Sequence, residues 1–79
     1  MSLAVRIVTP TGILFDGPAD EAVIPGLEGA LGIRHGHRRL ITALKAGKVR
    51  VKQGGTEKAF EISGGFADIG PDGAVIAAR

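Results

Sequence analysis

Glycine recurs along this chain at intervals of eight to eleven residues and divides it into short segments. The regularly spaced glycines are Gly17, Gly26, Gly36, Gly47, Gly55, Gly64 and Gly73. Short segments separated by turn signals at this spacing are typical of a β-sandwich or a β-barrel. The spacing therefore predicts an all-β fold built from many short strands.

Between the glycines, apolar and polar residues alternate, which is the pattern of a strand with one buried face. Residues 53–56 (QGGT) and 70–73 (GPDG) have the composition of hairpin turns. In the two clearest segments, the residues expected to face the core are Leu3, Val5, Ile7, Val49 and Val51.

The segment RRLITALKAG, residues 38–47, allows two interpretations. Leu40, Ile41 and Leu44 have helical spacing, with Gly47 as a possible C-cap. Leu40, Thr42 and Leu44 equally fit one face of a strand. We favour the strand because Ile41 and Thr42 are β-branched and both neighbouring segments alternate like strands.

The length of 79 residues predicts one small domain, residues 1–79. A domain of this size buries only about 60% of its unfolded surface. The chain has no cysteine, so no disulfide can stabilise it. Its stability must therefore come from a compact apolar core alone, or from such a core with help from a partner.

No apolar run approaches the roughly 18 to 20 residues of a membrane-spanning helix. The N-terminus lacks the charged start and apolar stretch of a signal peptide. A cytoplasmic protein without lipid insertion is therefore expected.

Positive charge is concentrated in one part of the chain. Of the ten Lys and Arg residues, seven lie between Arg34 and Lys52, a stretch that contains no Asp or Glu. They are Arg34, Arg38, Arg39, Lys45, Lys48, Arg50 and Lys52. A small basic β-barrel that binds single-stranded nucleic acid non-specifically is thus an alternative interpretation. The aromatic side chains that would stack on bases are missing between residues 16 and 59, which disfavours it.

His35 and His37 also lie in this basic stretch and could supply two metal ligands from one strand face. No cysteine or nearby acid completes such a site, and the adjacent arginines would repel a dication, so no metal is expected. Ser63 has no nucleophile elbow around it, and no phosphate-binding loop occurs. We therefore expect neither an enzyme nor a cofactor.

The segment EGALGIRHGHRRLITALKAGKVRV resembles the N-terminal β-sandwich of the epsilon subunit of bacterial F-type ATP synthase. The resemblance extends to both ends of the chain, through VRIVTPTGILFDGPADEAVIPGLEG and FEISGGFADIGPDGAVIAA. The matching positions in the central segment are Glu28, Gly29, Leu31, Gly32, Ile33, Gly36, His37, Leu40, Thr42, Ala43, Leu44, Lys45 and Gly47.

The resemblance implies a small flattened β-sandwich of about ten short, mostly antiparallel strands. It also implies a non-catalytic rotor subunit of the central stalk, with the gamma subunit and the polar loops of the c-ring as partners. The implied location is peripheral, on the cytoplasmic side of the bacterial inner membrane. For the edge that meets the c-ring and adjoining gamma, the implied residues are Glu28, Gly29, Leu31, Gly32 and His37. For the gamma face they are Thr9, Leu40, Ile41 and Thr42.

The sequence departs from the family pattern in three respects. Ala30 stands where the family usually has an acid, and Arg38 and Arg39 replace alanine and proline. Together these changes predict a basic edge, which implies either a partner with compensating acids or a divergent ATPase operon. The family usually continues into a two-helix C-terminal domain, whereas this sequence ends at Arg79, so inhibition by those helices is not expected of these residues.

Overall fold

The computed structural model describes residues 2–79, and within them nine strands form and no helix does. The strands are β1 (Leu3–Thr9), β2 (Gly12–Ala19), β3 (Glu21–Gly26), β4 (Gly29–Ile33), β5 (Leu40–Leu44), β6 (Gly47–Gln53), β7 (Thr56–Ile62), β8 (Gly65–Ile69) and β9 (Gly73–Ala78). The predicted all-β sandwich is confirmed, with nine strands where about ten were expected. No helix within the described residues could span a membrane.

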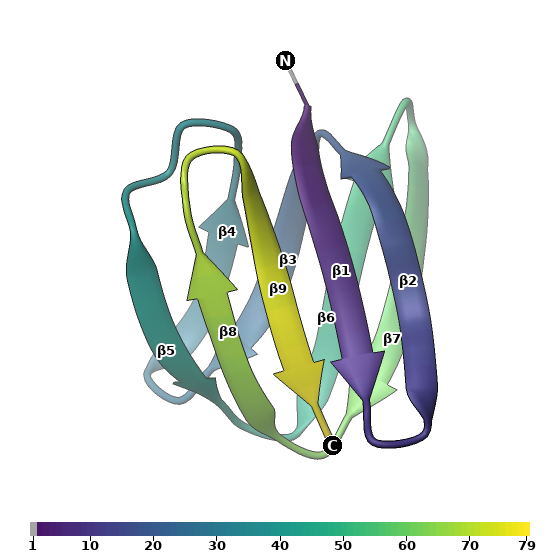
Figure 1. The fold of residues 1–79 in the computed structure, drawn as a ribbon, viewed down its shortest axis with the longest axis vertical. Helices are drawn as coiled ribbons and strands as arrows, with labels where there is room; N and C mark the ends of the chain where they lie inside the picture. The colour runs from purple at the N-terminus through teal and green to yellow at the C-terminus, as the bar shows by residue number, and fades with distance from the viewer. Residues whose placement is uncertain (1) are drawn as a thin grey trace.

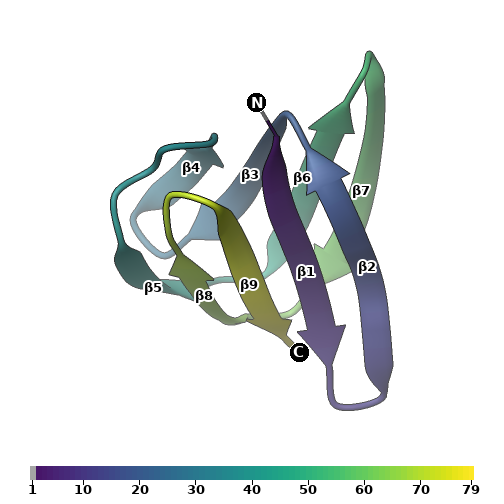
Figure 2. The same cartoon turned by 45° about the horizontal axis from the view of Figure 1, so that its top comes forward.

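The strands lie in two layers that face each other (Figure 1). The front layer has the order β2-β1-β9-β8-β5, and the back layer has the order β4-β3-β6-β7. The pairing of β1 with β9 is parallel, and the other strand pairs are antiparallel. Figure 2 shows the layers diverging from a common edge near the end of β5.

One continuous sheet makes both layers, because β5 and β6 pair in turn with the same edge of β3. Leu44 of β5 lies opposite Gly26, and Arg50 of β6 lies opposite Val23. Between these pairs, the amide of Lys45 donates to the carbonyl of Pro25 at 2.9 Å. The chain therefore turns the corner of the sandwich without breaking the sheet.

The alternating residues of the strands meet between the layers and form the core. Leu3 and Ile7 are completely buried, and Val5 nearly so. Val49 and Val51 face them from the back layer, also buried. The predicted inward faces of β1 and β6 are thus confirmed.

Both predicted hairpin turns are confirmed. Gly54 and Gly55 have φ angles of 56° and 83°, as a two-residue type I′ turn between β6 and β7 requires. The amide of Gly70 donates to the carbonyl of Gly73 at 2.9 Å and closes the turn between β8 and β9. Residues 40–44 form a strand, as favoured, because pairing with β8 along all five residues decides between the two patterns.

Candidate partner interface

An apolar row crosses the outer surface of the front layer. Its members are cross-strand neighbours on all five strands, and their side chains point away from the core: Ala43, Phe66, Ala77, Val8 and Ile13. Phe66 and Ile13 expose 61% and 59% of their surface. A contiguous exposed apolar surface of this kind is typical of a protein–protein contact. We call these five residues the apolar row.

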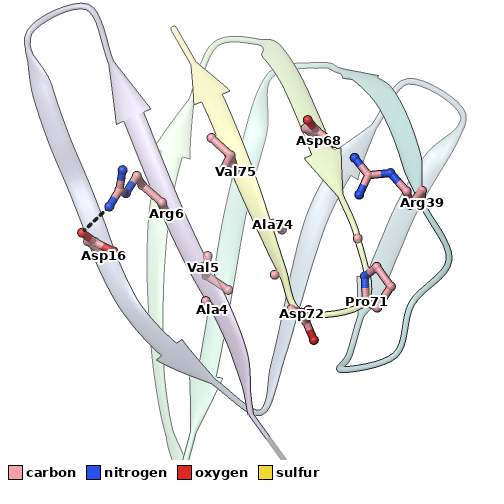
Figure 3. A pocket seen from close by; sticks show the side chains of 12 residues that line it. Ala4, Val5, Arg6, Asp16, Arg39, Asp68, Pro71, Asp72, Ala74 and Val75 are labelled. Atoms are coloured by element: carbon pink, nitrogen blue, oxygen red, sulfur yellow. Dashed lines mark hydrogen bonds and ion pairs between the residues drawn. The ribbon is translucent and has the colours of Figure 1, made fainter.

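The row beside it is mixed in charge. Arg6 donates to a carboxylate oxygen of Asp16 at 3.2 Å, and both side chains are about half exposed. Figure 3 shows this pair and, farther along the same hollow, Arg39 and Asp68. The outer face of the front layer therefore has an apolar band with a charged border, which is the usual anatomy of an interface.

The β3–β4 hairpin brings Leu27 and Glu28 to the end of the apolar row. Gly26 and Gly29 close a two-residue loop, so Leu27 and Glu28 form its exposed tip. The amide of Leu27 donates to the carbonyl of Ala43 at 3.2 Å, which fastens the tip to β5. Leu27 exposes 61% of its surface and lies beside Ala43, the last residue of the apolar row.

A hollow separates β4 from β5. Residues 26–31 and 40–43 line it, and we call it the β4–β5 hollow. It brings together Glu28, Gly29 and Leu31 from one group of predicted interface residues and Leu40, Ile41 and Thr42 from the other. The two groups, which the family resemblance assigned to separate contacts, thus adjoin in space.

The three predicted residues of β5 do not share a face. Ile41 points outward and is 72% exposed, in the row next to Phe66. Leu40 and Thr42 alternate with it and are half-buried, and Leu40 packs against the core. Thr9 lies at the end of β1, where its hydroxyl donates to the carbonyl of Gly12 at 3.0 Å. It lines a hollow with Phe66 and so borders the apolar row.

His37 lies far from Glu28, with which it had been grouped. Glu28 precedes β4 and His37 follows it, so the length of the strand separates them, and they lie at opposite ends of the sandwich (Figure 1). The loop of residues 34–39 instead contacts the β8–β9 turn, where the amide of Gly36 donates to the carbonyl of Pro71 at 2.7 Å. The nitrogen Nδ1 of His37 lies 2.6 Å from the carbonyl oxygen of Arg38. The single edge predicted from the sequence is therefore two places on the molecule.

The predicted basic edge is divided in the same way. Ala30 is the second residue of β4, near the hairpin tip, while Arg38 and Arg39 lie beyond the other end of that strand. These substitutions therefore do not combine into one basic surface. The expectation of a single basic edge was wrong, because residues 29–33 form an extended strand that separates them.

The remaining cations alternate with acids on the outer face of the back layer. Lys52 lies 3.7 Å from Glu21 and 3.9 Å from Glu57, and Lys48 lies opposite Glu61 in the β6–β7 pair. Arg34 lies 3.5 Å from Glu21. Acidic residues that lie outside the basic segment in the sequence are thus neighbours of its cations in the fold. They offset part of the positive charge, which weakens the electrostatic basis for nucleic-acid binding.

Among residues 2–79, no three His, Asp or Glu side chains gather as a metal site would require. His35 lies 3.7 Å from Asp72, and His37 has only the backbone contact described above. The two histidines have separate partners.

The sequence of residues 2–79 matches the family described as "ATP synthase, Delta/Epsilon chain, beta-sandwich domain". The chain belongs to this family. An ATP synthase epsilon chain of Caulobacter vibrioides is 47% identical over 73 residues, which are 92% of this chain and 85% of that protein. Epsilon chains of Gloeothece citriformis and Alkalihalophilus pseudofirmus are 45% and 40% identical. The matched region covers 50% and 59% of those two relatives, so this chain spans little more than half their length.

Solved structures of the ATP synthase family share the fold. A chain of the Euglena gracilis mitochondrial ATP synthase superposes with a TM-score of 0.90 at 24% identity, over 98% of this chain and 50% of its own. A chain of the Tetrahymena thermophila central stalk and c-ring structure gives 0.79 at 18% identity, over 100% of this chain and 64% of its own.

None of the five residues of the apolar row was among the interface residues predicted from the sequence. One sequence signal could have revealed it. In GGFADIG, Ala67 and Ile69 alternate with Phe66 and Asp68, and burial of the first pair leaves Phe66 outward. Its neighbours in the row could not be found in this way, because they depend on which strands pair.

Proposed function

We propose that this chain is a central-stalk, or rotor, subunit of an F-type ATP synthase that links the gamma subunit to the c-ring during ATP synthesis. The observation that carries the proposal is the apolar row on a chain of the delta/epsilon family. The two chains of similar fold occur in solved assemblies that contain F1, the central stalk and the c-ring.

The apolar row is the proposed contact with gamma. Side chains as exposed as Phe66 and Ile13 gain free energy when a partner covers them, at roughly 25 cal/mol per Å² of apolar surface. Ile41 beside the row and Thr9 at its end belong to the same contact. The charged border with Arg6 and Asp16 then contributes more to the orientation of the partner than to its affinity.

The hairpin tip with Leu27 and Glu28 is the proposed contact with the polar loops of the c-ring. The tip is exposed and projects at the end of the molecule opposite His37. Gly29, Leu31 and Gly32 follow the tip along β4. His37 lies beyond the other end of β4, so it does not join Glu28 in this contact. A rigid sheet carrying both contacts would transmit torque between its partners without a flexible joint.

The proposed role is structural and not catalytic, and the proposed position is peripheral, on the cytoplasmic side of the bacterial inner membrane. An interface protein of this kind needs complementary surfaces in place of a nucleophile, a base or a cofactor. In this proposal, these residues link the two partners mechanically. Other subunits of the complex catalyse ATP synthesis.

Site-specific cross-linking tests this proposal, because this sequence has no cysteine and an introduced one is therefore its single labelling site. Three single-cysteine variants, Phe66→Cys, Glu28→Cys and Ala59→Cys, would be labelled with a photoactivated cross-linker as isolated chains and then assembled into synthase membranes. We expect Phe66→Cys to link to gamma and Glu28→Cys to the c-ring. Ala59→Cys on the back layer is the control and should link to neither. Equal yields from all three positions would contradict the proposal.

A further inference from the structure

The strand β4 has one edge without a partner. β4 pairs with β3 and with no other strand in the described part of the chain. The direction of its backbone groups follows from the pairing of β3. The carbonyl of Pro25 accepts from Lys45 on the far side, so Pro25 and its opposite residue Ala30 form a pair that is not hydrogen-bonded. The backbone groups of Ala30, and by alternation those of Gly32, therefore point to the free edge.

The edge is also unprotected. Free strand edges usually carry a proline, a charged side chain or a cover that prevents further pairing. The free edges of β2 and β7 follow this rule, since β2 contains Asp16 and Pro18 and β7 contains Glu57, Lys58 and Glu61. β4 reads GALGI and has neither proline nor charge. Ala30 and Gly32 are exposed, so their small side chains leave the outward backbone groups accessible.

The free edge of β4 borders the β4–β5 hollow. On its other side, the carbonyl of Ala43 already accepts from Leu27 outside the β5–β8 ladder. Leu31 and Leu40 are half-buried in the lining and pack against the core. A strand that entered here would set apolar side chains against these two leucines and its backbone against Ala30 and Gly32.

We propose that β4 accepts an extended strand of the partner that covers the apolar row, with apolar side chains facing Leu31. The two contacts are continuous, because Ala43 belongs to both the row and the β4–β5 hollow. The inference rests on the proposed function, since its partner is the gamma subunit proposed there.

Amide hydrogen exchange, followed by NMR on the labelled chain alone and in its complex with gamma from the same genome, tests the inference. In the free chain, the amides of Ala30 and Gly32 should exchange rapidly, while those of Leu31 and Ile33, directed to β3, should be protected. In the complex, exchange at Ala30 and Gly32 should slow by at least about tenfold. A complex in which both amides remain fast would overturn the edge proposal and leave the proposed function intact. Failure to form any complex would contradict both.

A matched pair of variants gives a second measurement. Gly32→Pro removes the outward N–H without removing a bond to β3, and Gly32→Ala adds a similar first carbon but keeps the N–H. Gly32→Pro should bind gamma at least about tenfold more weakly than Gly32→Ala. Equal affinities of two folded variants would overturn the proposal, and if Gly32→Pro fails to fold, the exchange data on the unmodified chain decide.

Discussion

The rings of Phe15 and Phe60 meet across the open side of the sandwich, with centroids 5.8 Å apart and planes tilted by 56°. Phe15 lies on β2 and Phe60 on β7, the terminal strands of the two layers. The strands do not pair, so this aromatic contact takes the place of a ladder where the sheet fails to close. The ammonium group of Lys58 lies 5.8 Å from the Phe15 centroid and covers it from solvent.

Replacement of Phe60 by alanine should destabilise the fold. The change removes the aromatic pair and leaves a gap beside the core, so the free energy of unfolding should fall by about 2–3 kcal/mol. Phe66→Ala removes the same atoms from an exposed site and should change it by less than about 0.5 kcal/mol. Urea denaturation of both variants checks the prediction. Similar losses would show that the Phe15–Phe60 contact does not close the sandwich.

Gly65 is required for the close approach of β8 to β9. It is buried with φ at 138°, and a Cβ atom added there would collide with the carbonyl oxygen of Ala77. Gly12 has a similar φ of 149° but nothing within 4 Å of an added Cβ. We expect Gly65→Ala to cost about 3 kcal/mol or more and Gly12→Ala about 1 kcal/mol, measured by thermal unfolding. Equal costs would mean that the positive φ angle alone, and not the collision with Ala77, determines the loss of stability.

Much of the fold follows from short-range patterns in the sequence. Alternation placed Leu3, Val5 and Ile7 in the core, and the pair Gly54-Gly55 specified a type I′ turn. These features depend on neighbours within a few residues, which a single sequence contains. The parallel pairing of β1 with β9 joins the two ends of the chain, and no local pattern determines it.

The candidate interface was less predictable for the same reason. Glu28 and His37 are close in sequence, yet β4 separates them, and a strand advances about 3.3 Å per residue. Had residues 29–33 been assigned as a strand, the separation would have followed. The apolar row is different, because Phe66, Ala77 and Val8 become neighbours only through two strand pairings that no short motif encodes.

Phe66→Glu should abolish binding of gamma without unfolding the chain. The substitution places a charge in the centre of the apolar row, where burial without a partner is costly, so affinity should fall by at least about 100-fold. Ala59→Glu adds the same charge to the exposed outer face of the back layer and should leave affinity unchanged. Isothermal titration calorimetry with gamma compares the two, and circular dichroism verifies the fold. Similar affinities for both variants would remove the row from the gamma contact.

The chain should not bind single-stranded nucleic acid. Lys48 and Lys52 lie among Glu21, Glu57 and Glu61, and none of the three phenylalanines lies on that face. Fluorescence anisotropy with labelled oligothymidine should show no saturable binding at about 0.15 M salt. Saturable binding that weakens with added salt, and that Arg50→Glu reduces, would restore the nucleic-acid interpretation.

The most direct test of the proposed gamma contact is size-exclusion chromatography with light scattering of the chain mixed with gamma from the same genome. We expect an equimolar complex that persists at about 0.5 M salt, because screening at this concentration weakens charge contacts but not burial of the apolar row. A complex that dissociates completely at that salt, or no complex at all, would contradict it.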